Sequence, residues 1–188
     1  MGLREKVAPA VPAIEPRKGL APSKPLSIIQ SSIGSFEGRK VGVLVTSGSD
    51  RGLLDAIRKH VEAEGATVEI VAPTVGEIGA SDGSWIEGDQ KIGGGRSVLY
   101  DAIVVLPSDA GAAMLAKLPA AKQFAADAFA HLKFIGYTKA VLLLFQKAGI
   151  AEDLDEGCIE LTDVKSVKAF VSSCRQLRLW EREKALAE

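Results

Sequence analysis

The sequence predicts an α/β fold, a three-layer doubly wound sheet in which most strands are parallel. Short apolar runs alternate with amphipathic stretches: the run at 40–46 precedes a helical pattern at 51–64, and the run at 102–106 precedes another at 120–131. Strands that alternate with helices imply a mostly parallel sheet covered on both faces. The length of 188 residues fits one domain with an extension.

Helical periodicity places the remaining helices and their inward faces. The helix at 51–64 is expected to stop at Gly65, and another helix is expected at 139–147. Asp163 can cap the last helix. The residues expected to face inward from the first and last helices are Leu53, Leu54, Ile57 and Val61, and Val164, Val167, Phe170, Val171 and Cys174.

Three further strands are expected, at 67–71, 133–136 and 157–161. The segment 76–97 is rich in Gly and Asp and contains short alternating pieces, which predicts one or two small hairpins. Within it, 93–97 resembles a phosphate loop by composition. We interpret it as a hairpin instead, because it precedes a strand and does not join a strand to a helix.

The chain is expected to divide near residue 37. Residues 1–37 contain recurrent prolines and are predicted to form a proline-rich, polyproline-like linker arm. The arm is either a disordered linker or an ordered segment along a neighbouring surface, since it also keeps apolar residues. The α/β domain is expected at 38–180 and a C-terminal tail at 181–188.

Charge and cysteine content exclude several classes of function. Lys and Arg number 23 and Asp and Glu number 24, which argues against nucleic acid or an anionic membrane as the main partner. The two cysteines are too few for a disulfide framework, and the N-terminus lacks the apolar region of a signal peptide. We therefore expect a cytoplasmic protein. No apolar run is long enough to span a bilayer.

In doubly wound folds, ligands bind where strands end and helices begin. The turn after the strand at 133–136 continues Tyr137-Thr138-Lys139 and offers no Ser, Cys or His as nucleophile or base. The loop 46–52 could hold an anion at the start of a helix. Because it lacks the glycine pattern of a nucleotide loop, we interpret its Ser and Asp residues as a helix cap.

Other chemically interesting residues have structural interpretations. His60 and His131 lie near the C-terminal ends of two predicted helices, where the helix dipole favours them. Cys158 and Cys174 are interpreted as structural thiols, because neither stands at a strand-to-helix elbow. The acidic run 152–157 lacks the ligand spacing of an EF-hand and is interpreted as a solvated loop.

The order of elements resembles that of the DJ-1/PfpI family, which belongs to the class I glutamine amidotransferase-like superfamily and has a flavodoxin-like fold. The shared segments are 41–45, 82–89, 100–107 and the turn after 134–135. In active members a Glu follows the first strand and a Cys occupies the elbow. Here Asp50 follows the first strand and Tyr137 stands nearest the Cys position, so the resemblance implies that protease, deglycase and glyoxalase activities are absent.

Nearly the whole chain resembles the C-terminal domain of large-subunit haem catalases, a DJ-1-like module without the catalytic Cys. The shared segments are 22–27, 36–41, 76–78, 82–83, 97–102, 124–133 and 178–183. The resemblance implies a parent enzyme that disproportionates hydrogen peroxide at a haem, together with partners in a catalase core domain and the neighbouring subunits of a tetramer.

The same resemblance implies that the haem lies in the parent enzyme and not in this chain. The family's distal His and Asn and proximal Tyr belong to the preceding domain. This sequence has no Asn, and neither Tyr100 nor Tyr137 carries over as an axial ligand. We therefore expect no catalytic, cofactor-binding or metal-binding residues here.

Three hypotheses for function follow. The first is a non-catalytic accessory domain that stabilises the subunit and the tetramer of a large catalase. The second is an ATP-independent, chaperone-like holdase related to DJ-1, which would bind unfolded proteins. The third is a cryptic small-molecule or hydrolase site around Ser47, Ser49, Ser108 and Tyr137, in which Ser108 and the residues after it would supply an anion pocket.

Overall fold

The computed structural model describes residues 19–21, 23–27 and 34–186. The chain separates into two units, 1–32 and 33–188. In the described part of the first unit, the segment Lys24–Leu26 forms a 3-10 turn, η1, and Leu20 and Leu26 are 74% and 83% exposed. Most of the predicted proline-rich arm lies outside the described residues, so its conformation stays a prediction.

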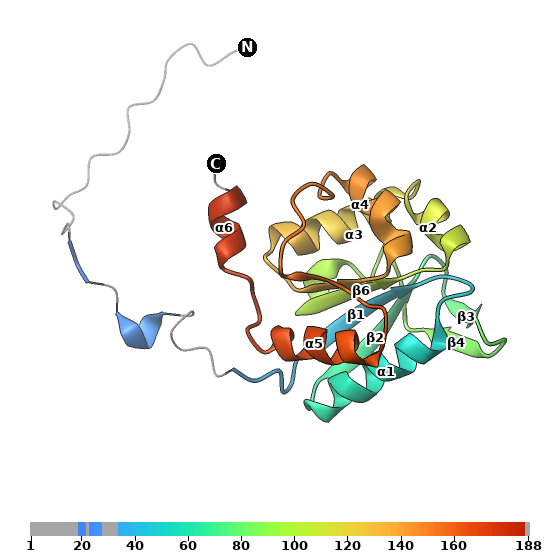
Figure 1. The fold of residues 1–188 in the computed structure, drawn as a ribbon, viewed down its shortest axis with the longest axis horizontal. Coiled ribbons are helices and arrows are strands. Elements are labelled where there is room, and N and C mark those ends of the chain that lie inside the picture. Colours follow the sequence, from blue (N-terminus) through green and yellow to red (C-terminus); the bar gives the residue numbers. More distant parts are fainter. Residues whose placement is uncertain (1–18, 22, 28–33, 187–188) are drawn as a thin grey trace, which may run out of the picture. The chain divides into compact units, whose positions relative to one another are not determined.

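The second unit is built on a six-stranded parallel sheet with the strand order β5-β2-β1-β6-β7-β8 (Figure 1). The strands are β1 (Lys40–Val45), β2 (Thr67–Ala72), β5 (Gln90–Lys91), β6 (Ala102–Leu106), β7 (Ile135–Tyr137) and β8 (Cys158–Glu160). Apart from the short edge strand β5, this is the flavodoxin-like order. The predicted doubly wound fold is confirmed.

Helices cover both faces of this sheet, as Figure 1 shows. One face carries α1 (Arg51–Ala63) and α5 (Val164–Cys174), and the other carries α2 (Asp109–Leu115), α3 (Pro119–Ala130) and α4 (Leu142–Ala148). The short helix α6 (Glu181–Leu186) lies within the predicted C-terminal tail. As predicted, α1 ends before Gly65, whose φ of 74° is a conformation that favours glycine.

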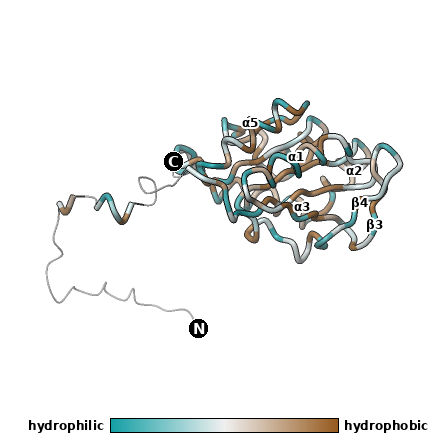
Figure 2. The backbone as a smooth tube through the Cα atoms, turned by 90° about the horizontal axis from the view of Figure 1, so that it is seen from below, coloured by the Kyte–Doolittle hydropathy of each residue, from teal (hydrophilic) through white to brown (hydrophobic). Residues whose placement is uncertain are grey.

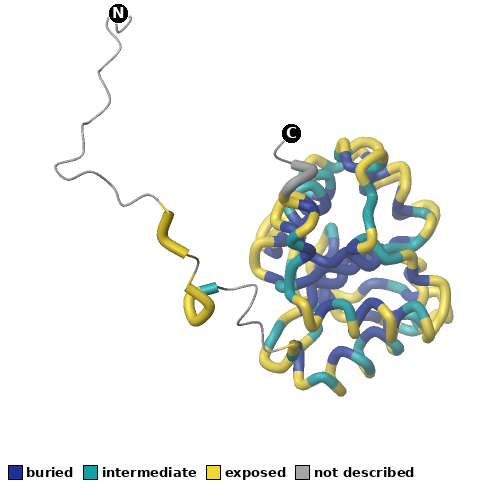
Figure 3. Tube along the Cα trace, turned by 60° about the vertical axis from the view of Figure 1, so that its left-hand side comes forward, coloured by how far each residue is buried: buried dark blue, intermediate teal, exposed yellow. Residues whose placement is uncertain are grey.

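The core consists of two apolar layers separated by the sheet. Val43 of β1 packs in the layer under α1 and α5, and the next residue, Leu44, packs in the layer under α3 and α4. This alternation follows from the two-residue period of a strand. The central strands are accordingly hydrophobic in Figure 2 and buried in Figure 3.

The structure confirms one of the one or two hairpins predicted for the segment 76–97 and corrects the hairpin interpretation of 93–97. The segment forms one antiparallel hairpin, β3 (Gly76–Gly79) with β4 (Trp85–Gly88), and β5 then joins the edge of the main sheet beside β2. The glycines at 93–95 therefore do not form a second hairpin. They lead into a 3-10 turn, η2 (Ser97–Leu99).

Val164 was predicted to face inward and is instead 57% exposed. It is the first residue of α5, directly after the capping Asp163. The inward assignments of Val167, Phe170 and Cys174 are confirmed. Helix α2 was not predicted, because its seven residues, DAGAAML, are too short and too rich in Ala and Gly to show an apolar period.

Candidate functional site

The carboxyl ends of β1, β6 and β7 lie at one edge of the sheet, because these neighbouring strands are parallel. The sequence candidates follow these ends: Ser47 and Ser49 come after β1, Ser108 comes after β6, and Tyr137 ends β7. The topology thus brings all four to one edge. We call this edge the carboxyl corner, and its chemistry depends on what each side chain contacts.

Ser49 is fully buried and its hydroxyl is occupied by backbone groups. The hydroxyl lies within donating distance of two carbonyl oxygens, at 2.5 Å from Leu106 and 2.8 Å from Thr46, and it accepts the N–H of Thr46 at 2.9 Å. It therefore ties the ends of β1 and β6 together. A hydroxyl held in this way, with no base beside it, is not an activated nucleophile.

Ser108 serves as the N-cap of α2. Its hydroxyl donates to the Ser47 carbonyl at 2.6 Å and accepts the Gly111 N–H at 3.1 Å. Its own N–H donates to the Thr46 hydroxyl at 3.1 Å. The N–H groups of Ser108 and Gly111 are thus directed at protein oxygens, as is usual around a Ser cap.

Helix α2 lies so close to the end of β1 that little space is left between them. A Cβ added at Gly111 would stand 2.6 Å from the Cβ of Thr46, a separation that real Cβ atoms do not show. The absence of a side chain at position 111 allows this approach. At this point the carboxyl corner is filled by protein atoms.

The turn after β7 lacks the strained geometry of a nucleophile elbow. Thr138 has φ −99° and ψ 155°, which is ordinary extended backbone, before the 3-10 turn η3 (Lys139–Val141). Tyr137 packs edge-on against Phe145 with ring centroids 5.2 Å apart, and burial raises the pKa of Tyr137. Its phenol is consequently neutral at physiological pH.

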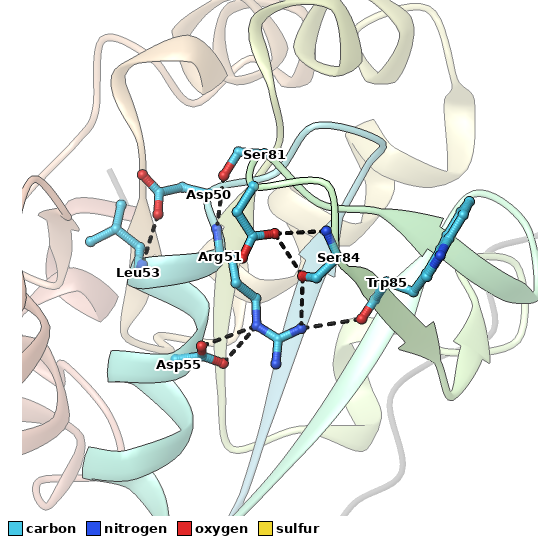
Figure 4. A network of polar contacts seen from close by, with 8 residues as sticks. Asp50, Arg51, Leu53, Asp55, Ser81, Ser84 and Trp85 are labelled. Atoms are coloured by element: carbon cyan, nitrogen blue, oxygen red, sulfur yellow. Dashed lines mark hydrogen bonds and ion pairs between the residues drawn. The ribbon is translucent and has the colours of Figure 1, made fainter.

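The loop after β1 fastens the β3–β4 hairpin to α1, as Figure 4 shows. Asp50 accepts the N–H of Leu53 at 2.9 Å, which confirms the predicted helix cap. Arg51 donates from Nε to both carboxylate oxygens of Asp55, at 2.9 and 3.0 Å, and from Nη1 to the carbonyl of Trp85 at 3.1 Å.

The histidines and cysteines occupy the structural positions that the sequence indicated. His60 lies in the last turn of α1 and His131 is the C-cap of α3. Cys174 is buried, and burial raises its pKa well above the ordinary value. Cys158 is half-buried in β8, and burial raises its pKa to about 11. Neither thiol is an activated thiolate at neutral pH.

The acidic run before β8 supplies an ion pair. Asp155 contacts Arg182 of α6, with Nε and Oδ2 2.6 Å apart. Among the residues that the structure describes, no cluster of three or more His, Cys, Asp or Glu side chains could hold a metal ion. Within those same residues, no helix is both long and apolar enough to cross a membrane.

Sequence reasoning missed a group of buried cations at the opposite, amino end of the sheet. Lys133 and Arg182 are 2% and 3% exposed, and Arg178 lies close by in the loop before α6. Nothing in the periodicity marks these residues, because Lys133 and Arg178 lie between regular elements and Arg182 lies in a helix of only six residues. The only signal was their position within segments shared with large catalases.

Comparisons with known proteins agree with this architecture. Catalase C of Rhizobium meliloti is 50% identical over 183 residues, which cover 97% of this chain and 26% of that protein. Catalase HPII of Pseudomonas putida is 34% identical over 154 residues, or 82% of this chain and 21% of that protein. The chain therefore spans about a quarter of the length of these curated relatives.

Solved structures with the same fold include DJ-1 of Toxoplasma gondii. It superimposes with a TM-score of 0.61 at 18% identity, over 80% of this chain and 96% of that chain. A two-domain protein of Anabaena variabilis, with DJ-1/ThiJ/PfpI-like and ferritin-like domains, also gives a TM-score of 0.61, at 12% identity over 72% of this chain and 48% of that chain. These likenesses concern the fold alone.

The family comparison covers most of the chain. A family model described as the C-terminal domain found in long catalases matches residues 37–184. The match begins shortly before β1 and ends within α6. It therefore includes both Asp155 and Arg182, which form the ion pair between the loop before β8 and α6. The chain belongs to the family of C-terminal domains found in long catalases.

Proposed function

We propose that this chain is the non-catalytic accessory domain of a longer haem catalase and that it stabilises the subunit and the tetramer of that parent. The filled carboxyl corner carries the proposal: Tyr137 stands where relatives of this fold place a nucleophile, Ser49 and Ser108 serve as backbone ties, and Gly111 approaches Thr46 closely. Family membership and 50% identity to a catalase support the identity of the parent.

In this proposal the haem and the peroxide chemistry belong to the rest of the parent chain. The two tyrosines here do not fit an axial role. Tyr100 is 2% exposed and so close to Gly42 that a Cβ there would stand 2.6 Å from its ring, and Tyr137 packs on Phe145. Both rings are engaged in packing within the domain, and no step of the reaction is derived through these residues.

The proposal assigns residues 1–37 to a tether, 38–180 to the accessory domain and 181–188 to a tail that is anchored through Arg182. The partners are the catalase core and the neighbouring subunits. We place the parent in the cytoplasm, in accordance with the two free cysteines.

The test begins with the full-length product of the gene, purified from its own cells. We expect a longer polypeptide with a Soret band that forms a tetramer, whereas the 188-residue chain alone should be colourless and inactive towards peroxide. A stoichiometric Soret band on the isolated chain, or a native gene product that contains no haem portion, would refute the proposal.

A second candidate function is the ATP-independent holdase. It is favoured by Leu20 and Leu26, which are 74% and 83% exposed in the described part of the arm, since exposed apolar side chains commonly mark protein contacts. Light scattering of a heat-denatured client, with and without equimolar chain, tests it. Scattering that the chain leaves unchanged would eliminate this candidate, and a Leu20→Ser, Leu26→Ser variant would show whether the arm is responsible.

A further inference from the structure

An open cavity of about 450 Å³ lies at the amino ends of β6 and β7, opposite the carboxyl corner. Its walls come from η2, from the end of α3 and from the loop between α5 and α6. The lining residues are Val98, Ala130, His131, Leu132, Lys133, Arg178 and Trp180.

Two cations in this wall have no carboxylate partner. Lys133 donates to the carbonyl oxygens of Ser97 and Tyr100, each at 2.6 Å. Arg178 donates from Nη1 to the carbonyl of Asp101 at 3.1 Å. Within the described residues, neither side chain forms an ion pair.

Asp101 and Asp127 are the carboxylates whose charges act on these cations, and neither forms an ion pair with them. Asp101 is already engaged. Asp101 pairs with Arg39 at 3.5 Å and accepts the backbone N–H of Lys40 at 3.0 Å. Burial lowers the pKa of Arg178, and burial together with the charge of Arg178 lowers the pKa of Lys133 to about 8. Arg178 is therefore a partly desolvated charge beside a second, buried cation, and a carboxylate from outside would neutralise it.

Exposed apolar side chains adjoin these cations. Val98 and Leu99 of η2 are 62% and 54% exposed, and Trp180 is half-buried at the cavity wall. We call Val98, Leu99, Arg178 and Trp180 the η2 surface. Apolar and aromatic side chains combined with an Arg are typical of the buried centre of a protein interface.

The start of β1 lies beside the η2 surface. Arg39 and Lys40 both bind the Asp101 side chain, and Arg178 binds the carbonyl of the same residue. In Catalase C of Rhizobium meliloti, the part outside the match is large, because the match covers only 26% of that protein.

Resting on the proposed function, we propose that the η2 surface docks onto the part of the parent catalase that precedes this domain. An acidic side chain of that part enters the cavity and pairs with Arg178, while apolar side chains cover Val98 and Leu99. The isolated domain exposes this surface only because its neighbour is missing.

Photo-crosslinking in the full-length parent tests the contact. A benzoyl-phenylalanine at Leu99 should capture peptides from the part of the parent that precedes the domain. The matched control is the same residue at Leu143 of α4, which is 45% exposed and lies away from the cavity. We expect at least a fivefold higher yield from position 99. Equal yields, or no capture at position 99, would overturn the inference.

The role of the positive charge at position 178 is tested with Arg178→Gln, introduced into the full-length parent that carries the crosslinker at position 99. We expect this variant to reduce capture at position 99 at least threefold, whereas Arg175→Gln, in an exposed pair with Glu64, should leave capture unchanged. An unchanged yield in Arg178→Gln would overturn the role of the acidic side chain. Melting curves of both variants of the isolated chain confirm that each is folded.

The outcomes separate this inference from the proposed function. A haem tetramer without capture at position 99 refutes the docking surface and leaves the accessory role standing. A parent without haem refutes the accessory role, and the docking surface, which rests on that role, falls with it. Saturable binding of benzoate to the isolated chain that Arg178→Gln abolishes, combined with no crosslink, would make the cavity a small-anion site and would also overturn the docking surface.

Discussion

Arg182 and Asp155 form a bidentate ion pair, with Nε 2.6 Å from Oδ2 and Nη2 2.7 Å from Oδ1. The Arg182 side chain is 1% exposed. Its Nη1 donates to the carbonyl oxygens of Phe129 and Lys133, at 3.1 and 2.9 Å, and its guanidinium stacks over the Phe129 ring. One side chain thus joins α6 to α3 and to the loop before β8.

Replacing Arg182 by Ala should destabilise the domain strongly. The change removes the buried guanidinium from Asp155 and from the carbonyl groups of Phe129 and Lys133, and breaking such a pair costs about 3 kcal/mol or more. For a domain of this size, that lowers the melting temperature by ~10 °C. The control is Arg175→Ala, which removes an exposed pair with Glu64 and should cost less than ~1 kcal/mol. Equal losses in the two variants would contradict the anchoring role.

Lys133 should make the stability depend on pH in the alkaline range. Its pKa is lowered to about 8 in the folded protein from an ordinary 10.5. Between these values the unfolded chain binds more protons than the folded one, so this residue's contribution to the free energy of unfolding rises with pH. The limiting slope is about 1.4 kcal/mol per pH unit.

Urea denaturation of wild type and Lys133→Met measures this contribution. The free energy of unfolding is determined between about pH 7.5 and about pH 10, in steps of about 0.5 pH unit. The stability of wild type minus that of the variant should increase with pH. Lys147→Met, at an exposed position of α4, is the control and should run parallel to wild type. Parallel curves for Lys133→Met would show that its pKa is not lowered by folding.

Gly111→Ala tests how tightly α2 closes the carboxyl corner. The added methyl group would meet Thr46, so the helix must shift, which costs about 1–3 kcal/mol. Gly93→Ala is the matched control, because a Cβ at position 93 has no atom within 4 Å. Thermal melts of the two variants should differ by several degrees, and a Gly111→Ala protein as stable as the control would mean that the corner has spare room.

Both thiols should react slowly in the native state. Cys174 is 1% exposed and its pKa is raised, so labelling by a thiol reagent at neutral pH requires unfolding. Cys158 is half-buried with a pKa near 11 and should label faster than Cys174 but slower than a free thiol. Mass spectrometry of each cysteine over time gives the order, and rapid native labelling of Cys174 would contradict its burial.

Much of the fold could be predicted from local pattern. The strand at 40–45, the helix that ends before Gly65 and the burial of Cys174 all follow from periodicity and capping, which act over a few residues. Val164 was misassigned because it belongs to the first turn of its helix, where periodicity does not decide burial. The edge strand β5 has two residues, Gln90 and Lys91, and carries no pattern of its own.

Only part of the site could be predicted from the sequence. The missing nucleophile at Tyr137 is visible in the chain itself. The hydrogen bonds of the Ser49 and Ser108 hydroxyls could not be predicted from the chain. Ser49 binds the carbonyl of Leu106, 57 positions away, and Ser108 binds the carbonyl of Ser47, 61 positions away. The buried cations Lys133 and Arg182 were missed for the same reason, since their contacts join segments that are distant in the sequence.

We propose that this domain stabilises a catalase without taking part in its chemistry. The most direct test compares the full-length parent with a parent that ends before residue 34, by peroxide turnover per haem and by the temperature at which the tetramer loses activity. We expect unchanged initial turnover and an inactivation temperature lowered by ~10 °C or more. A truncated enzyme whose tetramer is equally stable but whose turnover per haem falls tenfold would contradict it.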